Sequence, residues 1–158
     1  MNKLRIKLAV RAINWLLIIF FMGCSGNEDK KVVETYSDGS PKVIQYFSGV
    51  GVEKTMVREQ IFYPDGQLRM DGEYKNGQKE GRWISYYNNG NPWSEGFYIG
   101  GKSEGKTTTW HENGKKYYEG FYKNNERSGK WTFWDEEGNL MKEIDYDAQV
   151  IESKQLGS

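Results

Sequence analysis

The fold is decided by residues 62–83, FYPDGQLRMDGEYKNGQKEGRW, because two later stretches repeat their pattern: residues 86–107, YYNNGNPWSEGFYIGGKSEGKT, and residues 110–131, WHENGKKYYEGFYKNNERSGKW. Glycines and a tyrosine recur at a step of 24 residues. The recurring residues are Gly66, Gly90, Gly114 and Gly138; Gly72, Gly96 and Gly120; Gly81, Gly105 and Gly129; and Tyr74, Tyr98, Tyr122 and Tyr146. A fixed period of this length is the signature of a repeat protein, so the sequence predicts tandem copies of one structural unit.

Each repeat contains two turn signals, separated by short runs rich in tyrosine, tryptophan, threonine and isoleucine. The first signal is Asn89-Gly90 or Asn113-Gly114, in which the glycine can adopt a positive φ at no steric cost. The second lies at residues 75–77, 100–101 and 124–125. The runs between the turns suit a pleated sheet, and strands joined so tightly must be antiparallel neighbours. The sequence therefore predicts an all-β chain, a β-meander built from one hairpin per repeat.

The N-terminal segment has the features of an export signal. Four basic residues precede an apolar run at residues 13–22, which is broken only by Asn14 and followed by Gly23 and Cys24. The run is shorter than the roughly 20 residues that span a bilayer, and its basic flank is typical of a signal peptide. Residues 21–24, FMGC, resemble a bacterial lipobox, which implies that the Cys24 thiol is lipidated and that residues 1–23 are removed. The alternative is an uncleaved signal anchor with an unused thiol.

The composition of the rest of the chain indicates a tether, a repeat domain and a tail. Residues 24–31 are small or charged and read as a solvated tether, whose acidic residues resemble the surface-export signals of some Bacteroidetes lipoproteins. The repeat domain is expected at residues 32–153, followed by a tail at residues 154–158. Its first unit diverges, because three extra residues between Ser48 and Met56 predict a longer loop there. A final edge strand is expected at Val150-Ile151.

The repeat resembles a known family. Its pattern is aromatic-x-x-(Asn/Asp/Glu)-Gly-x5-Gly-x-Tyr-x-x-Gly-x3-Gly-x-Trp, and it resembles the MORN repeat variant (MORN_2), also found in YwqK-type antitoxin proteins, over about residues 33–150. The departures are Thr107 for the tryptophan, Ile144 for the middle glycine and Asn125 for the turn glycine. The resemblance implies an elongated, twisted antiparallel sheet. It also implies an interaction scaffold, since most proteins with this repeat serve as one.

The charge balance argues against nucleic acid as a partner. The chain has 22 basic and 22 acidic side chains, and removal of residues 1–23 leaves 18 basic ones, a net charge of about −4. Binding to nucleic acid depends on lysine and arginine that neutralise phosphates, and so does adhesion to anionic lipid. The membrane link is therefore expected to be covalent, through the lipid on Cys24.

No catalytic or metal-binding motif stands out. His111 is the only histidine and Cys24 the only cysteine, so no Cys/His pair or zinc cluster can be assembled. The plentiful carboxylates mostly recur with the repeat and therefore mark a strand position. These are Asp71, Glu95, Glu119 and Glu143. We expect a protein that is not an enzyme and that needs no cofactor or metal.

The aromatic residues have two interpretations. Rows of rings across neighbouring strands stabilise a sheet by roughly 0.2–1 kcal/mol per pair. Alternatively they form a binding face, because a single-layer sheet leaves rings exposed that suit a sugar, a peptide or an apolar partner. The candidate face consists of Tyr74, Trp83, Tyr86, Trp93, Tyr98, Trp110, Tyr117, Tyr122, Trp131 and Trp134. Trp93, Tyr117 and Tyr118 lack a counterpart in every repeat and are the candidates for specificity.

Together these features favour a membrane-anchored, non-enzymatic lipoprotein of a bacterial cell envelope. It would act as a repeat-built interaction module for a protein or an envelope polymer such as a glycan. The alternative is a YwqK-like antitoxin component of a toxin–antitoxin system, although export argues against it. A third possibility, a glycan hydrolase, would need a buried carboxylate pair that a thin sheet does not offer.

Overall fold

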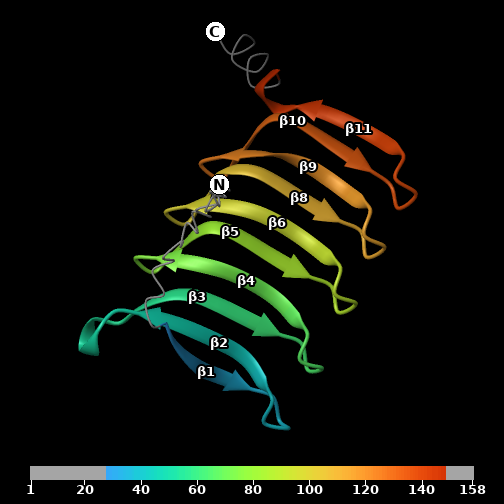
Figure 1. Ribbon diagram of the computed structural model, residues 1–158. Helices are drawn as coiled ribbons and strands as arrows, with labels where there is room; N and C mark the ends of the chain where they lie inside the picture. Colours follow the sequence, from blue (N-terminus) through green and yellow to red (C-terminus); the bar gives the residue numbers. More distant parts are fainter. Residues whose placement is uncertain (1–27, 149–158) are drawn as a thin grey trace, which may run out of the picture.

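A computed structural model describes residues 28–148, which form a single antiparallel sheet of 11 strands (Figure 1). The strands are β1 (Asp29–Thr35), β2 (Pro41–Ser48), β3 (Thr55–Phe62), β4 (Leu68–Lys75), β5 (Gln78–Tyr86), β6 (Pro92–Ile99), β7 (Lys102–Ser103), β8 (Gly105–Trp110), β9 (Lys116–Lys123), β10 (Glu126–Trp134) and β11 (Leu140–Asp145). They follow one another across the sheet in chain order, with the short β7 paired to β6. The predicted all-β meander is confirmed.

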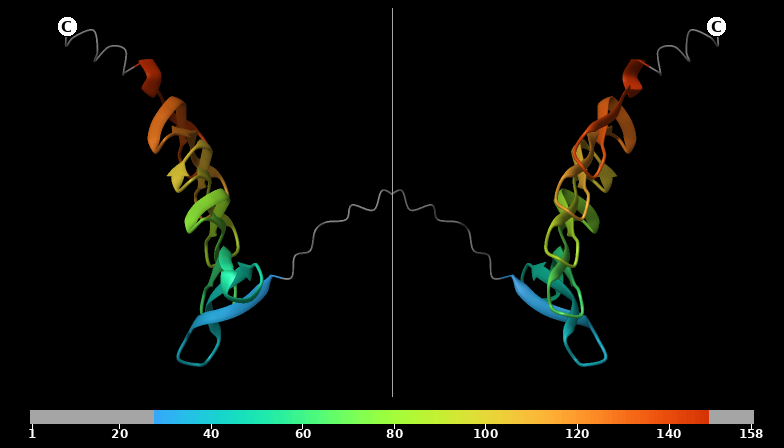
Figure 2. Two further views of the ribbon diagram at one scale, coloured as in Figure 1. Left: turned by 90° about the vertical axis from the view of Figure 1, so that its left-hand side faces the viewer. Right: turned by 90° about the vertical axis from the view of Figure 1, so that its right-hand side faces the viewer.

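The sheet is one layer thick. Figure 2 shows it edge-on as a narrow, twisted band, with the N-terminal strands at one end and the C-terminal strands at the other. A short 3-10 helix, η1 (Gly51–Glu53), lies in the loop between β2 and β3, where the sequence predicted an insertion. With a single layer, the tightest packing comes from side chains that lie along the sheet surface.

Five-residue loops, which join the strands at one of their two ends, carry the first row of predicted turn glycines. Gly66, Gly90, Gly114 and Gly138 all adopt φ between 83° and 86°, as predicted. Their amides donate to the carbonyl three residues earlier, as in Gly90 N to Tyr87 O at 3.0 Å. The loops at Gly66, Gly90 and Gly114 close with an Asx-type bond, for example from the Asn91 amide to Asn89 Oδ1 at 2.9 Å, and in the loop at Gly138 the Asn139 amide donates to Asp135 Oδ1 instead. A side chain at this glycine would be strained whatever space surrounds it.

Two-residue turns join the strands at their other ends. Both central residues have positive φ in the turns at residues 76–77, 100–101 and 124–125, as a type I′ turn requires. Asn125, which replaces the glycine of the repeat, has φ 71°. Asparagine tolerates this region better than other residues with a side chain, so the replacement does not disturb the hairpin.

A row of side-chain hydrogen bonds ties each repeat to the next. The first residue of each five-residue loop bonds to the carbonyl that precedes the next loop along the sheet. The pairs are Tyr36 Oη to Phe62 O at 2.7 Å, Tyr63 Oη to Tyr86 O at 2.8 Å, Tyr87 Oη to Trp110 O at 2.8 Å, and His111 Nε2 to Trp134 O at 3.0 Å. His111 therefore replaces a tyrosine without loss of the bond.

The strand β1 begins earlier than the predicted domain boundary. It starts at Asp29, inside the segment 24–31 that was predicted to be a tether, and Asp29 pairs with Phe47 of β2. All seven residues of β1 are exposed, so this edge strand is held by backbone pairing rather than by an apolar pattern. The predicted signal peptide at 1–23, Cys24, the Val150-Ile151 strand and the tail at 154–158 lie outside the described residues.

Candidate functional site

The two faces of the sheet differ in chemistry. Cross-strand partners share a face, so the pairs Gly72–Trp83 and Trp83–Gly96 place this tryptophan and the middle glycines together. We call this side, which carries Tyr74, Trp83, Tyr98, Tyr122 and Trp131, the aromatic face. The opposite side carries the recurring carboxylates Asp71, Glu95, Glu119 and Glu143, and we call it the ion-pair face.

Trp83 lies flat in a gap that a glycine provides. A Cβ atom at Gly72 would fall 2.1 Å from Trp83 Cδ2, so a glycine is required beneath the indole. The indole Nε1 donates to Glu73 O at 3.1 Å, and the Tyr74 ring meets the indole edge-on at 5.1 Å between centroids. The Lys79 ammonium lies 4.0 Å from the indole centroid. These contacts leave Trp83 only 5% exposed.

Trp131 repeats the arrangement two units later. A Cβ at Gly120 would lie 2.2 Å from Trp131 Cδ2, Nε1 donates to Phe121 O at 3.2 Å, and Tyr122 meets the ring edge-on at 5.2 Å. Trp131 is fully buried, at 0% exposed. The candidate binding face included both tryptophans, and this part is corrected, because their rings are covered by tyrosine and cationic side chains. They belong to the buried core of the described sheet, together with Val43, Ile44 and Ile84.

The middle repeat lacks its tryptophan, and a hollow of about 250 Å³ lies there on the aromatic face. Thr107 occupies the tryptophan position, yet Gly96 is retained across from it. A Cβ at Gly96 would be 3.7 Å from Thr107 Oγ1, which is an ordinary contact. The missing indole therefore leaves space over Gly96, which Trp83 and Tyr98 border toward one end of the sheet and Tyr118 toward the other.

Thr109 lines this hollow and carries an unpaired hydroxyl. Its side chain is 7% exposed, and among the described residues Thr109 Oγ1 is the buried side-chain polar atom that has no hydrogen-bond partner. By contrast, Thr107 Oγ1 donates to Glu95 O at 3.1 Å. Buried polar atoms in folded proteins are nearly always paired, so the unpaired Thr109 hydroxyl is an exception within this sheet.

Three candidate residues, Tyr86, Trp110 and Trp134, end their strands on the ion-pair face. Trp110 lines a second hollow, of about 210 Å³, together with Phe97 and Glu119. The Lys116 ammonium lies 5.6 Å from the Trp134 ring centroid and also bonds to Glu119. These rings lie beside charged groups, away from the hollow at Thr107.

Trp93 and Tyr117 occupy bulges near the edge that carries the five-residue loops. In β6 the pairing passes from Ser94 to Pro92, so Trp93 is the extra residue, and in β9 Tyr117 is extra in the same way. A bulge re-aims the side chain it carries. The two rings are 49% and 43% exposed, and their role as specificity positions stays a prediction. His111 lies 4.9 Å from the Tyr117 ring.

The ion-pair face carries a ladder of charge pairs with the period of the repeat. Each recurring carboxylate pairs with a cation 13 residues earlier in the chain. The pairs are Arg58–Asp71 at 2.6 Å, Arg82–Glu95 at 2.8 Å, Lys106–Glu119 at 3.1 Å and Lys130–Glu143 at 2.7 Å. This ladder confirms that the carboxylates mark a strand position.

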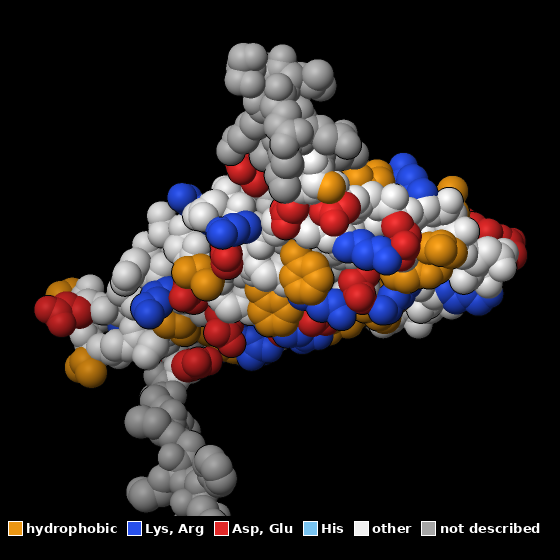
Figure 3. Space-filling view, turned by 90° about the horizontal axis from the view of Figure 1, so that it is seen from above, with side chains coloured by type: hydrophobic (Ala, Val, Ile, Leu, Met, Phe, Trp, Pro, Cys, Tyr) orange, Lys and Arg blue, Asp and Glu red, His pale blue; other side chains and the backbone are white. Residues whose placement is uncertain are grey.

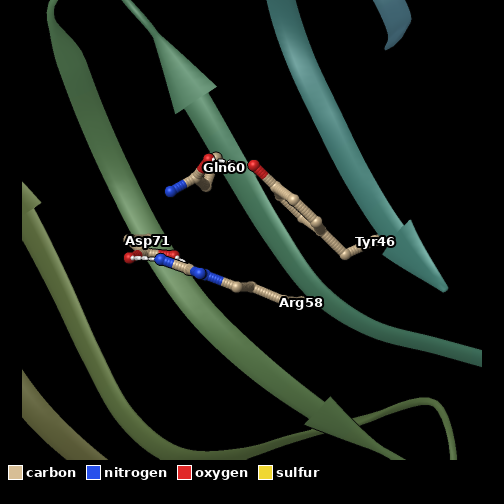
Figure 4. A network of polar contacts seen from close by, with 4 residues as sticks. All are labelled: Tyr46, Arg58, Gln60 and Asp71. Carbon is tan, nitrogen blue, oxygen red and sulfur yellow. Dashed lines mark hydrogen bonds and ion pairs between the residues drawn. The ribbon is translucent and has the colours of Figure 1, made fainter. Parts of the chain in front are cut away.

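Arg58 forms the most complete pair. Its guanidinium donates twice to Asp71 and lies 5.5 Å from the Tyr46 ring, while Tyr46 Oη donates to Gln60 at 2.6 Å (Figure 4). The hydrogen bond to Asp71 raises the pKa of Arg58. Figure 3 shows acidic and basic side chains interspersed with hydrophobic ones, so the visible surface has no field of a single sign.

Glu119 has two cationic partners, Lys106 and Lys116, at 3.1 and 2.6 Å. Burial alone would raise the pKa of Glu119, but the hydrogen bonds from both lysines outweigh it, and the pKa is lowered. Burial also raises the pKa of Tyr74, which packs on Trp83. Both groups are thus held in their ordinary charge states at neutral pH.

Two features of the site were missed by sequence reasoning. The cations of the ladder keep the same 24-residue step as the carboxylates, so aligning the repeats for basic residues would have found them. The hollow had a subtler signal, the loss of the tryptophan at Thr107 with retention of the glycine at Gly96. Thr109 gave no signal, because only its surroundings show that its hydroxyl is unpaired.

Within residues 28–148, no three His, Cys, Asp or Glu side chains are grouped so that they could hold a metal ion. In that same part of the chain, no helix is long and apolar enough to cross a membrane.

The repeat pattern matches a known family. The family model of the MORN repeat variant (MORN_2) matches residues 58–76, 79–99, 103–124 and 127–148. These segments run from β3 to the end of β11 and make up more than half of the chain. No curated protein matches the sequence.

Solved structures show distant likenesses. The Glycosylation Associate Protein (Gap123) complex from Streptococcus agalactiae is 14% identical with a TM-score of 0.44, over 84% of this chain and 24% of that one. The GtfA/B complex bound to UDP and GlcNAc is 10% identical with a TM-score of 0.30, over 83% and 27%. A protein of unknown function from Bacteroides fragilis is 11% identical with a TM-score of 0.22, over 80% and 98%. This chain spans about a quarter of the length of the first two.

Proposed function

The chain belongs to the MORN repeat variant family, and from this premise we propose that it is a lipid-anchored, non-enzymatic interaction module of a bacterial cell envelope. Its partner would be a protein or an envelope polymer, held on the aromatic face. The observation that carries the proposal is the hollow at Thr107, which the rings of Trp83, Tyr98 and Tyr118 border. Tyr98 and Tyr118 are half-buried there and offer part of their ring surface to a partner.

The ionisable groups of the sheet support a binding role over a catalytic one. His111 Nε2 is bonded to the Trp134 carbonyl, and the four recurring carboxylates are held in the ion-pair ladder. A general acid or base needs a group that is free to exchange a proton with a substrate. These groups instead hold neighbouring repeats together.

The sequence around Cys24 supports the anchor. Four residues separate Cys24 from Asp29, where β1 begins. An extended chain spans at most about 3.6 Å per residue, so the sheet would start within roughly 18 Å of the lipid. Such an anchor would hold the sheet against the envelope membrane and limit its partners to molecules found there.

The anchor is tested by growing the bacterium with radiolabelled palmitate and comparing the wild type with Cys24→Ser. We expect label on the wild-type chain and none on the variant, with the wild type in the membrane fraction. Label that is independent of Cys24 would overturn the anchor. The antitoxin alternative stays a prediction of the resemblance, and a Cys24-dependent label would count against it, because a lipoprotein acts outside the cytoplasm.

The binding face is tested by cross-linking in intact cells, followed by recovery of the full chain. We expect cross-links from a photoreactive residue at Trp93, which is 49% exposed on its bulge, and none from the same residue at Val52 in the loop beyond β2. Equal yields from the two positions would show that the rings do not direct binding.

A further inference from the structure

The hollow on the aromatic face lies between two repeats that each carry a tryptophan over a glycine. Trp83 and Trp131 cover Gly72 and Gly120, and the same position between them holds Thr107. The glycine of the middle repeat has therefore lost the ring that explains it elsewhere. What remains is a hollow of about 250 Å³ with a glycine floor.

The size of the hollow limits its occupant to one ring-sized unit. Sites for drug-sized molecules occupy roughly 300–1,000 Å³, and this hollow is smaller. It also lies on an open sheet, so the remainder of a larger ligand can extend along the aromatic face on either side. A polymer that inserts one unit fits this shape.

The lining is made of hydroxyls and rings. Ser85, Ser94, Thr107 and Thr109 supply hydroxyls, while Tyr98 and Tyr118 supply aromatic walls. The charged side chains nearby already have partners. On the ion-pair face Glu95 pairs with Arg82 and Lys106 pairs with Glu119. Lys79 lies over the rings of Trp83 and Tyr98. The hollow thus offers uncharged donors and acceptors between ring surfaces.

The Thr109 hydroxyl favours a polar occupant of the hollow over an apolar one. Its hydroxyl is buried and unpaired, at 7% exposed, and it lines the hollow. An aromatic side chain from a partner would fill the space but would leave this hydroxyl without a hydrogen bond. An occupant that carries its own hydroxyls can pair with this oxygen once the Thr109 side chain turns about χ1 toward the hollow that the residue lines.

We propose that this hollow binds one sugar ring of an envelope saccharide, an inference that rests on the proposed function as an interaction module. A pyranose presents hydroxyls around its edge and C–H groups on its faces. The edge would pair with Thr109 and the neighbouring hydroxyls, while a face would lie on tyrosine. Threonine in place of tryptophan at position 107 leaves the space for this sugar ring.

The test uses the full chain, purified in a detergent without a sugar headgroup, and isothermal titration with three probes. These are cellotetraose, the N-acetylglucosamine tetramer and mannotetraose. We expect the wild type to bind at least one of them at millimolar concentration or better. Thr107→Trp should abolish that binding while raising the melting temperature, because the indole finds Gly96 already in place beneath it.

Thr109→Val provides a second variant with almost unchanged shape. We expect it to melt no lower than the wild type, since the replaced hydroxyl has no partner, and to bind the saccharide about two- to tenfold more weakly. The matched control is Phe121→Ser on the opposite face, where the ring is 46% exposed. It should leave the affinity unchanged.

Binding of none of the three probes to the wild type overturns the proposal, and so does undiminished binding to Thr107→Trp. Equal loss in Phe121→Ser would also overturn it, because Phe121 does not line the hollow. The titration does not depend on the anchor. A negative titration together with cross-links from Trp93 and none from Val52 would therefore reject the saccharide site alone and leave the interaction module standing.

Discussion

Replacement of Gly72 by alanine isolates the contact on which the core of the sheet depends. The new Cβ would lie 2.1, 2.3 and 2.6 Å from three atoms of the Trp83 indole. Real carbon atoms do not approach so closely, so the ring must move off the strand. The indole is 5% exposed and donates to Glu73 O, so a shift toward the hollow that it borders would break that hydrogen bond and expose the ring.

Two known costs set the limits for the expected loss in the free energy of unfolding. Overpacking a core costs about 1–3 kcal/mol, and complete loss of a buried tryptophan costs about 3–5 kcal/mol. Displacement of the Trp83 ring lies between them, so Gly72→Ala should lower the free energy of unfolding by about 2–4 kcal/mol. At about 4 °C per kcal/mol for a domain of this size, the melting temperature should fall by roughly 8–16 °C.

Gly96→Ala is the matched control, because it changes the same position of the neighbouring repeat. Its Cβ would meet Thr107 Oγ1 at 3.7 Å, and neither Gly72 nor Gly96 has a positive φ. Loss of unfolded-state freedom should then stabilise the protein by about 0.4–1 kcal/mol. In the Thr107→Trp background, the same Gly96→Ala change should become as damaging as Gly72→Ala, since an indole would now cover it.

Urea and thermal unfolding followed by circular dichroism would measure these changes, with the near-ultraviolet signal reporting the tryptophan environment. The four chains Gly96→Ala, Thr107→Trp, their double variant and the wild type form a thermodynamic cycle. Similar losses for Gly72→Ala and Gly96→Ala, or additive effects within the cycle, would refute the idea that the indole alone makes the glycine necessary.

Three further predictions concern the turns, the inter-repeat bonds and the ion-pair ladder. Gly90→Val should cost about 1–3 kcal/mol because valine resists φ of 84°, whereas Glu95→Gln should cost less than about 1 kcal/mol; equal thermal shifts would contradict the turn assignment. His111→Phe should lose about 1 kcal/mol with the bond to Trp134 O, and His111→Tyr should keep it, as urea melts would show. The lowered pKa of Glu119 implies stability that is present above its unfolded value of about 4.5 and lost as pH falls through the folded value, so Glu119→Gln should flatten the acid limb of stability.

The turns and strands of the fold could be read from the sequence because their determinants are local. A glycine or asparagine that must adopt positive φ constrains its own backbone, and the 24-residue step shows that the constraint recurs. Gly90 and Asn125 both adopt the positive φ expected of them. The edge strand β1 was placed too late, because its charged residues carry no apolar pattern and it is held by pairing with β2.

The candidate site was less accessible to sequence reasoning. The repeat identified the aromatic columns, but whether a ring is exposed depends on its neighbours across the sheet. Trp131 is buried under Tyr122 and Arg127, while Trp93 is exposed because a bulge turns it outward. Residues of the same type thus have opposite accessibility, a distinction that their spacing alone does not contain.

By itself, the sequence determined the repeat, the family and the order of hairpins, since each depends on residues close together in the chain. The tertiary structure alone decided which glycines lie under an indole, which charges pair across strands and where the row of rings is interrupted. The reason is physical. Burial, and the unpaired state of the Thr109 hydroxyl, arise from atoms contributed by several strands, and these meet only when the hairpins stand side by side.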